Sequence, residues 1–451
     1  MAFPQLYPQK APRPGIRWVF TEGHNLRKDP LGTLLRCTLK FGHVVRYRGF
    51  WTTIQITHPE HILHVLQTNA ANYHKGRAYR ILKLSLGEGL LTSDGTLWQR
   101  QRKITQPAFH SRQLAAFVRI MRDHTLAMLQ QWETMAEHGR SFDIVPELMR
   151  LTLNIVSHAL FTTSLESEVD VIRQTQIVGR EFSVKRAFSV VQTPQWLPIP
   201  RNREYRHSLA RFHAVIDRMI QQRHKQPPHA NDLLQMLMEA FDENDTPMPA
   251  TQLRDEVATL LTAGHETTTL VLAWTIFLIS TRPEVMERMR AEIRGLNGGI
   301  PEYADLWRLR YTRMVVDETM RLYPPVWLIS RTAVTDDVIG GYEIPAGAEL
   351  LMLPYVTHRH PDWWVYPDKF WPEHFLPENC LGRPRGAYLP FGAGPRVCIG
   401  SSFAMTEILF VLVLLLQRFH PELVVDPAQV KVEASVTLRP SPGVPVRLER
   451  V

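Results

Sequence analysis

Residues 391–400 read FGAGPRVCIG and place a single cysteine, Cys398, in a glycine-rich loop just before a mostly apolar run that begins at Ser402. No Lys-Ser/Thr pair follows the glycines, so this is not a phosphate-binding loop. Cys398 has no second Cys or His at metal-pair spacing, which argues against zinc. A lone thiolate at a helix start is stabilised by the helix dipole and loop N–H groups. Haem iron accepts one such thiolate as its axial ligand.

The composition limits the alternatives. The chain has 451 residues, 44% of them hydrophobic, and a net charge of +8. Its basic residues are spread out rather than gathered in runs, so no nucleic-acid partner is expected, and an acidic redox partner suits the haem hypothesis better. The three cysteines, Cys37, Cys380 and Cys398, are too far apart and too few for a disulfide framework. We interpret the first two as buried structural residues.

The N-terminus lacks the pattern of a signal peptide, and no apolar run is long enough for a membrane span, so a cytoplasmic protein is expected. The opening of the chain is Pro-rich. Composition does not shift along the sequence enough to place a boundary. We therefore expect one catalytic domain over residues 1–451, with residues 1–40 as its lead-in.

Periodicity predicts a mainly α-helical fold with small β-sheets. Residues 44–57 and 432–449 are predicted to form hairpins, and residues 328–353 are strand-like. The longest helical pattern covers residues 250–281, with Thr251 as its N-cap and Pro283 as its stop. This helix would be about 45 Å long and nearly apolar all round, and so central to the fold.

That central helix carries the polar stretch Ala263-Gly264-His265-Glu266-Thr267-Thr268. Polar groups in a buried helix need partners or a cavity. Gly264 permits close approach to the helix, and a threonine hydroxyl one turn away can bond an i−4 carbonyl and bend it. The alternative interpretation is a buried structural helix in which the Thr and Gly residues have no functional role.

The cysteine loop resembles the haem-ligand signature Phe-Gly-x-Gly-x-Arg-x-Cys-x-Gly of the cytochrome P450 haem-thiolate monooxygenases at every fixed position. Further family motifs occur in the right order over about residues 40–445. The resemblance implies the cytochrome P450 fold, with haem b between a long distal helix and the proximal cysteine loop. It also implies that Cys398 binds the haem iron and that Phe391 packs against the proximal haem face.

The central helix resembles the family's oxygen-activating motif Ala/Gly-Gly-x-Asp/Glu-Thr. By that resemblance Thr267 hydrogen-bonds the bound dioxygen and Glu266 relays protons from solvent. Ala263 and Gly264 would lie against the haem. His265 occupies the variable position and is expected to pack without a functional role.

A third motif, Glu318-x-x-Arg321, resembles a buried structural network on the proximal side of the haem. Its usual third member is an arginine in Pro-Glu-Arg-Phe, but residues 372–375 read PEHF and place His374 there. Histidine titrates near neutral pH and has fewer donors than arginine. A weaker or pH-sensitive network is therefore expected.

Cationic and donor side chains are assigned to the haem propionates by resemblance. Trp98 and Arg102 match the family's Trp-x-x-x-Arg helix, and Arg396 lies in the cysteine loop. Arg331 and Lys75 match propionate-binding residues of some family members. Taken alone, Trp98 and Arg102 would be a packed indole beside a solvated arginine.

No flavin, ferredoxin or dinucleotide-binding module is recognisable after Cys398. The expected monomer therefore takes its electrons from a separate ferredoxin or flavodoxin with its reductase, and it uses O₂ and a lipophilic substrate. Some motifs resemble bacterial fatty-acid hydroxylases and others a carotenoid hydroxylase group. Arg46, Tyr47 or Arg48 could anchor a carboxylate, although an exposed strand edge is the simpler interpretation. The alternative functions are a non-catalytic haem-thiolate binding or sensing protein and a peroxide-driven peroxygenase.

Overall fold

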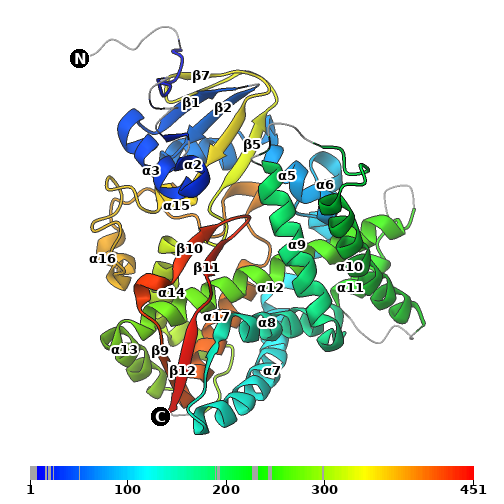
Figure 1. The fold of residues 1–451 in the computed structure, drawn as a ribbon, viewed down its shortest axis with the longest axis vertical. Coiled ribbons are helices and arrows are strands. Elements are labelled where there is room, and N and C mark those ends of the chain that lie inside the picture. The colour runs from blue at the N-terminus through cyan, green and yellow to red at the C-terminus, as the bar shows by residue number, and fades with distance from the viewer. Residues whose placement is uncertain are drawn as a thin grey trace. The chain divides into compact units, whose positions relative to one another are not determined.

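The computed structural model describes residues 8–15, 18, 22–23, 25–49, 51–187, 189, 193–225, 232–241, 246–296 and 299–451 (Figure 1). The first residues of the predicted Pro-rich lead-in, 1–7, lie outside this description. The described part is mainly helical with small sheets, as predicted. Contacts divide the chain into two compact units: unit 1 is Met1–Ile81 with Met320–Cys398, and unit 2 is Leu82–Thr319 with Ile399–Val451. The single catalytic domain stays a prediction.

Helices hold most of the described residues, and short strands lie between them along the chain. The α-helices are α2 (Asn25–Lys28), α3 (Pro30–Phe41), α4 (Pro59–Leu63), α5 (Arg77–Leu86), α6 (Gly95–Thr105), α7 (Ser111–Glu137), α8 (Ile144–Phe161), α9 (Val169–Ala187), α10 (Pro200–Lys225), α11 (Leu233–Met238), α12 (Ala250–Ser280), α13 (Pro283–Arg294), α14 (Arg310–Leu322), α15 (Pro354–Thr357), α16 (Pro377–Cys380) and α17 (Ser401–Arg418). The strands are β1 (Val44–Arg48), β2 (Thr52–Ile56), β3 (Tyr73–Lys75), β4 (Ser141–Asp143), β5 (Ile329–Ala333), β6 (Asp337–Ile339), β7 (Tyr342–Ile344), β8 (Glu349–Met352), β9 (Phe419–Leu423), β10 (Lys431–Ala434), β11 (Leu438–Ser441) and β12 (Pro445–Arg450).

Unit 1 is built on a five-stranded sheet in the order β1-β2-β8-β5-β3. The predicted hairpin is confirmed, because β1 pairs antiparallel with β2 in a register that sets Val44 opposite Ile56. β-Branched residues fit a pleated, half-buried surface, and Ile54 and Ile56 are fully buried in a core shared with Leu350. Helix α3, within the predicted lead-in, contacts β1 and lies beside the sheet in Figure 1.

Unit 2 is organised around α12, which begins and ends where the sequence indicated apart from its cap. The N-cap is Pro249, so the predicted N-cap at Thr251 is wrong. Backbone at Pro249 is extended and helical geometry starts directly after it, which places Thr251 inside the first turn. Helix α8 packs along α12 (Figure 1). Most of the α12 side chains from Leu253 to Ile279 are buried.

The C-terminal segment is more varied than the predicted closing hairpin. Strands β10 and β11 do form a hairpin, with Ala434 opposite Leu438. The last strand, β12, instead pairs with β9 and β4 in a second sheet of unit 2. Among the described residues α17 alone is long and apolar enough to cross a membrane by itself, and the bent pair α12 and α13 passes the same test together. The α17 window is 72% buried inside the fold, and a core helix passes the same test.

The loop before α6 rests directly on α12 through its backbone. The N–H of Glu88 donates to Asp255 Oδ2 at 2.8 Å, and that of Leu90 donates to Glu256 Oε2 at 3.1 Å. A Cβ added at Gly89 would lie 2.6 Å from the Asp255 carbonyl oxygen, so glycine is required there. Glu256 is fully buried, and burial raises its pKa to about 7.

This buried carboxyl predicts a stability that falls as the pH rises. The folded-state pKa lies above the ordinary value of 4.5, so the unfolded chain loses its proton first. Between about pH 4.5 and pH 7 the wild type should therefore lose up to about 3 kcal/mol relative to Glu256→Gln, whose side chain does not titrate. Denaturant unfolding of both proteins at pH 5 and pH 8 measures this difference. An equal difference at the two pH values would contradict it.

Candidate active site

The cysteine loop of unit 1 is closed by backbone bonds. The N–H of Cys398 donates to the Phe391 carbonyl oxygen at 2.9 Å, and that of Val397 donates to Gly394 at 3.0 Å. Gly392 and Gly394 both adopt positive φ, of 72° and 70°. A Cβ on Gly394 would overlap the Leu66 carbonyl oxygen, whereas one on Gly392 would meet nothing within 4 Å. The loop thus presents Cys398 as an exposed thiol three residues before α17.

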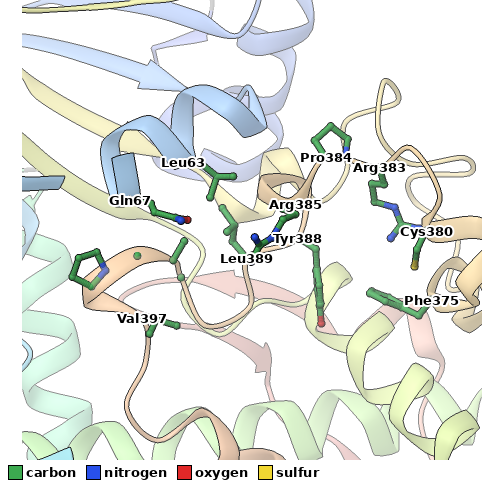
Figure 2. Close-up of a pocket in the computed structure, with 14 residues that line it drawn as sticks. Leu63, Gln67, Phe375, Cys380, Arg383, Pro384, Arg385, Tyr388, Leu389 and Val397 are labelled. Atoms are coloured by element: carbon green, nitrogen blue, oxygen red, sulfur yellow. The ribbon is translucent and has the colours of Figure 1, made fainter. Parts of the chain in front are cut away.

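A pocket of about 830 Å³ lies against this loop within unit 1 (Figure 2). Its wall joins the loop residues 392–395 and Val397 with the preceding segment, from which Arg383, Arg385 and Tyr388 contribute side chains. The described residues that line it include two arginines and no acidic side chain. This part of unit 1 therefore presents positive charge beside the cysteine loop.

Cys37 and Cys380 have different environments. Cys37 is fully buried, as predicted, and its Sγ lies 2.9 Å from the Tyr47 hydroxyl oxygen. Burial raises the pKa of this thiol. Cys380 is exposed at the end of the one-turn helix α16, so the prediction of a buried Cys380 is wrong. A short surface helix has too little cover to bury its last residue.

Two of the predicted propionate residues are neighbours in the sheet of unit 1. Lys75 on β3 lies directly opposite Arg331 on β5. Both stack on Tyr79, with Lys75 Nζ 4.2 Å and the Arg331 guanidinium carbon 5.8 Å from the ring centroid. Arg331 is only 6% exposed. Like charges directly opposite each other destabilise a sheet, so an anionic group beside this pair would be favourable.

Arg321, near the end of α14, belongs to the predicted structural network within unit 1. It is fully buried and donates to the carbonyl oxygens of His358, Pro367 and Lys369 at 2.6–2.9 Å. Its pairing with Glu318, which is also fully buried, stays a prediction.

His374 is bonded through Nε2 to the Val365 carbonyl oxygen and packs against Trp364, and its place in that network stays a prediction. The guanidinium of Arg383 stacks on the same indole, 4.0 Å from the ring centroid, and donates to the His374 carbonyl oxygen. Arg321 contacts that ring too, at 5.0 Å. Arg321 and Arg383 thus both contact the indole against which His374 packs.

Helix α6 of unit 2 carries Trp98 and Arg102, four residues apart on one face and both half-buried. The buried Gln101 fixes the helix against the preceding loop. Its amide donates to the Glu88 carbonyl oxygen at 2.6 Å and accepts from the Ser93 hydroxyl. Trp98 and Arg102 remain the predicted propionate donors.

One face of α12 is uncovered although the helix is otherwise mostly buried. Ala263 is exposed, and Gly264, Glu266 and Thr267 are half-buried. As predicted, the Thr267 hydroxyl donates to an i−4 carbonyl, that of Ala263, at 2.9 Å. The close approach at Gly264 is to α8, since a Cβ there would lie 2.8 Å from Val156 Cγ2. The haem contact of Gly264 stays a prediction.

Glu266 is tied to the β10–β11 hairpin. Its Oε1 accepts from Arg439 Nη1 at 2.7 Å and from the Thr437 hydroxyl at 2.9 Å. The two charged side chains are each 14% exposed. Arg439 also lines a second pocket of unit 2, about 200 Å³ in volume, together with Arg180 and Gln176. Burial, with Arg439 as a like charge, lowers the pKa of Arg180.

His265 packs, as predicted, and is held at both ring nitrogens. Its Nδ1 donates to the Leu261 carbonyl oxygen at 2.5 Å. The side-chain amide nitrogen of Gln176 donates to His265 Nε2 at 2.9 Å. Burial lowers its pKa, so the imidazole is neutral near pH 7. The Thr152 hydroxyl of α8 lies 3.2 Å from the His265 carbonyl oxygen. These bonds fix the turn of α12 that carries Glu266 and Thr267.

Several of these residues are not indicated by sequence patterns. The sequence predicted no role for Thr437, Arg439 or Arg383. Glu407 lies in the apolar helix α17 and is fully buried, with neither carboxyl oxygen hydrogen-bonded. Burial raises its pKa well above the ordinary value. A charged residue within an apolar run is the sequence signal that could have found it.

Each unit by itself carries groups whose chemistry suits haem. Unit 1 supplies an exposed thiol on a glycine-shaped loop and the cationic pair Lys75–Arg331. Unit 2 supplies an uncovered apolar and hydroxyl face on α12 and the Trp98–Arg102 helix. A thiolate, several cations for carboxylates and a flat apolar face are what an anionic, planar iron porphyrin requires.

Comparisons with known proteins agree with a haem-binding protein. The family model "Cytochrome P450" matches residues 12–445. Cyclooctatin synthase of Streptomyces melanosporofaciens is 35% identical over 395 residues, covering 86% of this chain and 81% of the relative. Cyclooctat-9-en-7-ol 5-monooxygenase of the same organism is 34% identical over 366 residues, covering 80% and 79%. The chloroplastic protein LUTEIN DEFICIENT 5 of Arabidopsis thaliana is 30% identical over 432 residues, covering 90% and 71%.

The crystal structure of the cytochrome P450DA heme domain is similar with a TM-score of 0.86 and 27% sequence identity, covering 99% of this chain and 98% of that one. The chain therefore belongs to the cytochrome P450 family and has the fold of that family. It binds haem b, and it is a monooxygenase.

The two glycines of the cysteine loop give a matched pair of variants. Gly394→Ala adds a Cβ that clashes with the rigid Leu66 carbonyl, whereas Gly392→Ala adds only the backbone strain of about 1–2 kcal/mol. Gly394→Ala should therefore lower both the melting temperature and the haem retained per chain more than Gly392→Ala does. Thermal unfolding and haem quantification of the purified proteins measure this. Equal losses in the two variants would contradict the loop geometry.

Proposed function

We propose that this monooxygenase hydroxylates a lipophilic isoprenoid substrate with O₂ and electrons from a separate acidic protein. Cys398 would be the axial ligand of the haem, which when bound supplies the activation of dioxygen. The observation that carries the proposal is that Thr267 and Glu266 are neighbours beside the exposed Ala263 of α12. Glu266 is bonded there to Arg439. The pair of Thr267 and Glu266 favours use of O₂ over a peroxide-driven reaction or a non-catalytic binding role.

In this proposal the protons reach the site through Glu266. Its Oε1 is held by Arg439 and Thr437, and Arg439 lines the 200 Å³ pocket, which would hold the water that supplies them. Glu266 would pass a proton towards the Thr267 hydroxyl, which donates a hydrogen bond to the Ala263 carbonyl oxygen. Arg439 acts here as a positioning residue, since it fixes the carboxylate that transfers the proton.

The electron donor is proposed to be an acidic ferredoxin or flavodoxin with its reductase. The support is the pocket beside the cysteine loop, whose described lining includes Arg383 and Arg385 and no acidic side chain. Complementary charge speeds the encounter of two proteins and orients them. A cytoplasmic monomer suits such a soluble donor.

An isoprenoid substrate is favoured over a fatty acid by two observations. The relatives include a cyclooctat-9-en-7-ol 5-monooxygenase and a protein whose name refers to lutein, a carotenoid. The Tyr47 hydroxyl, a predicted carboxylate anchor, instead donates to Gln55 Oε1 at 2.7 Å beneath α3. Arg46 lies 3.4 Å from the Thr52 hydroxyl, and the Arg48 side chain lies outside the described residues.

The substrate class is tested by titrating the haem protein with a cyclic terpene alcohol, a carotenoid and palmitate. Displacement of water from the iron shifts the haem spin state, which reports binding. An isoprenoid should bind at least about tenfold more tightly than palmitate and should be hydroxylated when ferredoxin and reductase are added. Tighter binding of palmitate would overturn the substrate class. Turnover with NAD(P)H alone would overturn the separate donor.

The role of Arg439 is tested by Arg439→Gln. The freed Glu266 carboxylate should transfer protons less effectively, so product formed per NAD(P)H should fall by about tenfold or more, with more hydrogen peroxide released and a shifted pH–rate profile. The matched control is Arg447→Gln, which removes an arginine from an exposed pair with Glu422 and should change neither quantity. Unchanged coupling and pH profile in Arg439→Gln would contradict the role.

A further inference from the structure

A second group of side chains with metal-binding chemistry lies within unit 1. His43 directly precedes β1, and His360 and Asp362 follow α15. One ligand atom from each of these three residues lies within 4.8 Å of the other two. No residue of this group belongs to the site described above. Two imidazoles and one carboxylate are a donor set that zinc accepts.

Two of the separations between these atoms suit a tetrahedral ion. His43 Nε2 lies 3.3 Å from Asp362 Oδ2, and His360 Nδ1 lies 3.5 Å from the same oxygen. Ligands at about 2.0–2.1 Å from a tetrahedral metal lie about 3.3–3.5 Å from one another. Adjacent ligands around an octahedral ion at the same bond length would lie only about 3.0 Å apart. The two distances to Asp362 Oδ2 are therefore closer to the tetrahedral spacing of Zn²⁺ than to the octahedral spacing.

The hydrogen bonds of His43 leave the lone pair of its Nε2 directed at Asp362. The Thr57 hydroxyl donates to the His43 carbonyl oxygen, so its own oxygen accepts from His43 Nδ1–H at 3.2 Å. In that tautomer His43 Nε2 carries a lone pair towards Asp362. His360 Nδ1 accepts from the backbone N–H of Asp362 at 3.3 Å, so its lone pair would exchange that hydrogen bond for the ion. Acceptors facing one another need a proton or a cation between them.

Hydrogen bonds between neighbouring segments hold these residues in place. The Thr57 N–H donates to the His43 carbonyl oxygen at 2.9 Å, and the Thr357 hydroxyl donates to the Thr57 carbonyl oxygen at 3.1 Å. The start of β1 and the turn after α15 are thus already joined. His360 is 6% exposed, whereas the Asp362 side chain is 54% exposed, which gives an ion access from solvent. The hydrogen bond from His43 Nδ1–H to the Thr57 hydroxyl oxygen also orients His43 as a ligand.

We propose that His43, His360 and Asp362 bind one Zn²⁺ ion, with water in the fourth position. The ion would cross-link the residue before β1 to the turn after α15 and so stabilise unit 1. This site is separate from the haem chemistry and does not depend on the proposed function.

The test uses the full-length haem protein after chelator treatment and dialysis. Titration with Zn²⁺ by calorimetry should give one site per chain and raise the melting temperature. Asp362→Asn keeps the shape of an exposed side chain and removes its charge, so the fold is not at risk. It should weaken Zn²⁺ binding by at least about tenfold and abolish the thermal shift.

The pair His124 and His158 provides the matched control. Their rings lie 4.5 Å apart at 46°, as those of His43 and His360 do, but they belong to no three-ligand group among the described residues. His124→Ala should leave Zn²⁺ binding unchanged. No binding by the wild type, equal binding by Asp362→Asn, or a loss of binding in His124→Ala would each overturn the proposal. Anomalous scattering that places zinc between His43 and His360 would support it directly.

Discussion

The polar turn in the middle of α12 is the constraint on which unit 2 depends. A helix buried along most of its length carries His265, Glu266, Thr267 and Thr268 in succession. Buried polar groups are costly unless they are hydrogen-bonded, so each needs a partner. Thr267 and Thr268 bond their i−4 carbonyls, His265 bonds Leu261 and Gln176, and Glu266 bonds the β10–β11 hairpin. Helices α8 and α9 and the hairpin are packed where these partners are required.

The same arrangement fixes the turn and leaves one of its faces open. The satisfied groups, His265 and Thr268, fix the helix, whereas the uncovered Ala263 and Thr267 leave one face open. Glu266 is the only charged residue of this turn, and Arg439 offsets its charge from a distant part of the chain. A paired carboxylate beside a small pocket can exchange protons with solvent without being left as an isolated buried charge.

Local patterns were predictable from the sequence. The cysteine loop, the hairpin of β1 and β2 and the extent of α12 depend on neighbouring residues, such as the glycines at positive φ and the alternation of Ile54 and Ile56. The cap of α12 was misplaced by two residues, because Pro249 already supplies the extended backbone that a cap needs.

Contacts between distant segments were not predictable. Arg439 meets Glu266 across 173 residues, and nothing local to either position indicates the pair. Gly264 is explained by the close approach of α8 at Val156, which no spacing along the sequence reveals. Arg383 stacks on Trp364, against which His374 also packs, an interaction that depends on the folded turn between them. The proposed zinc ligands likewise come from distant segments, His43 before β1 and His360 and Asp362 after α15.

The central claim is that Cys398 is the thiolate ligand of the haem. The most direct test is the carbon monoxide difference spectrum of the reduced protein, recorded for the wild type, Cys398→His and Cys380→Ser, since both Cys380 and Cys398 are exposed. The wild type and Cys380→Ser should show the long-wavelength band of a thiolate-ligated haem, and Cys398→His should show the shorter-wavelength band of an imidazole-ligated one. A thiolate band that survives in Cys398→His, or that is lost in Cys380→Ser, would contradict the account.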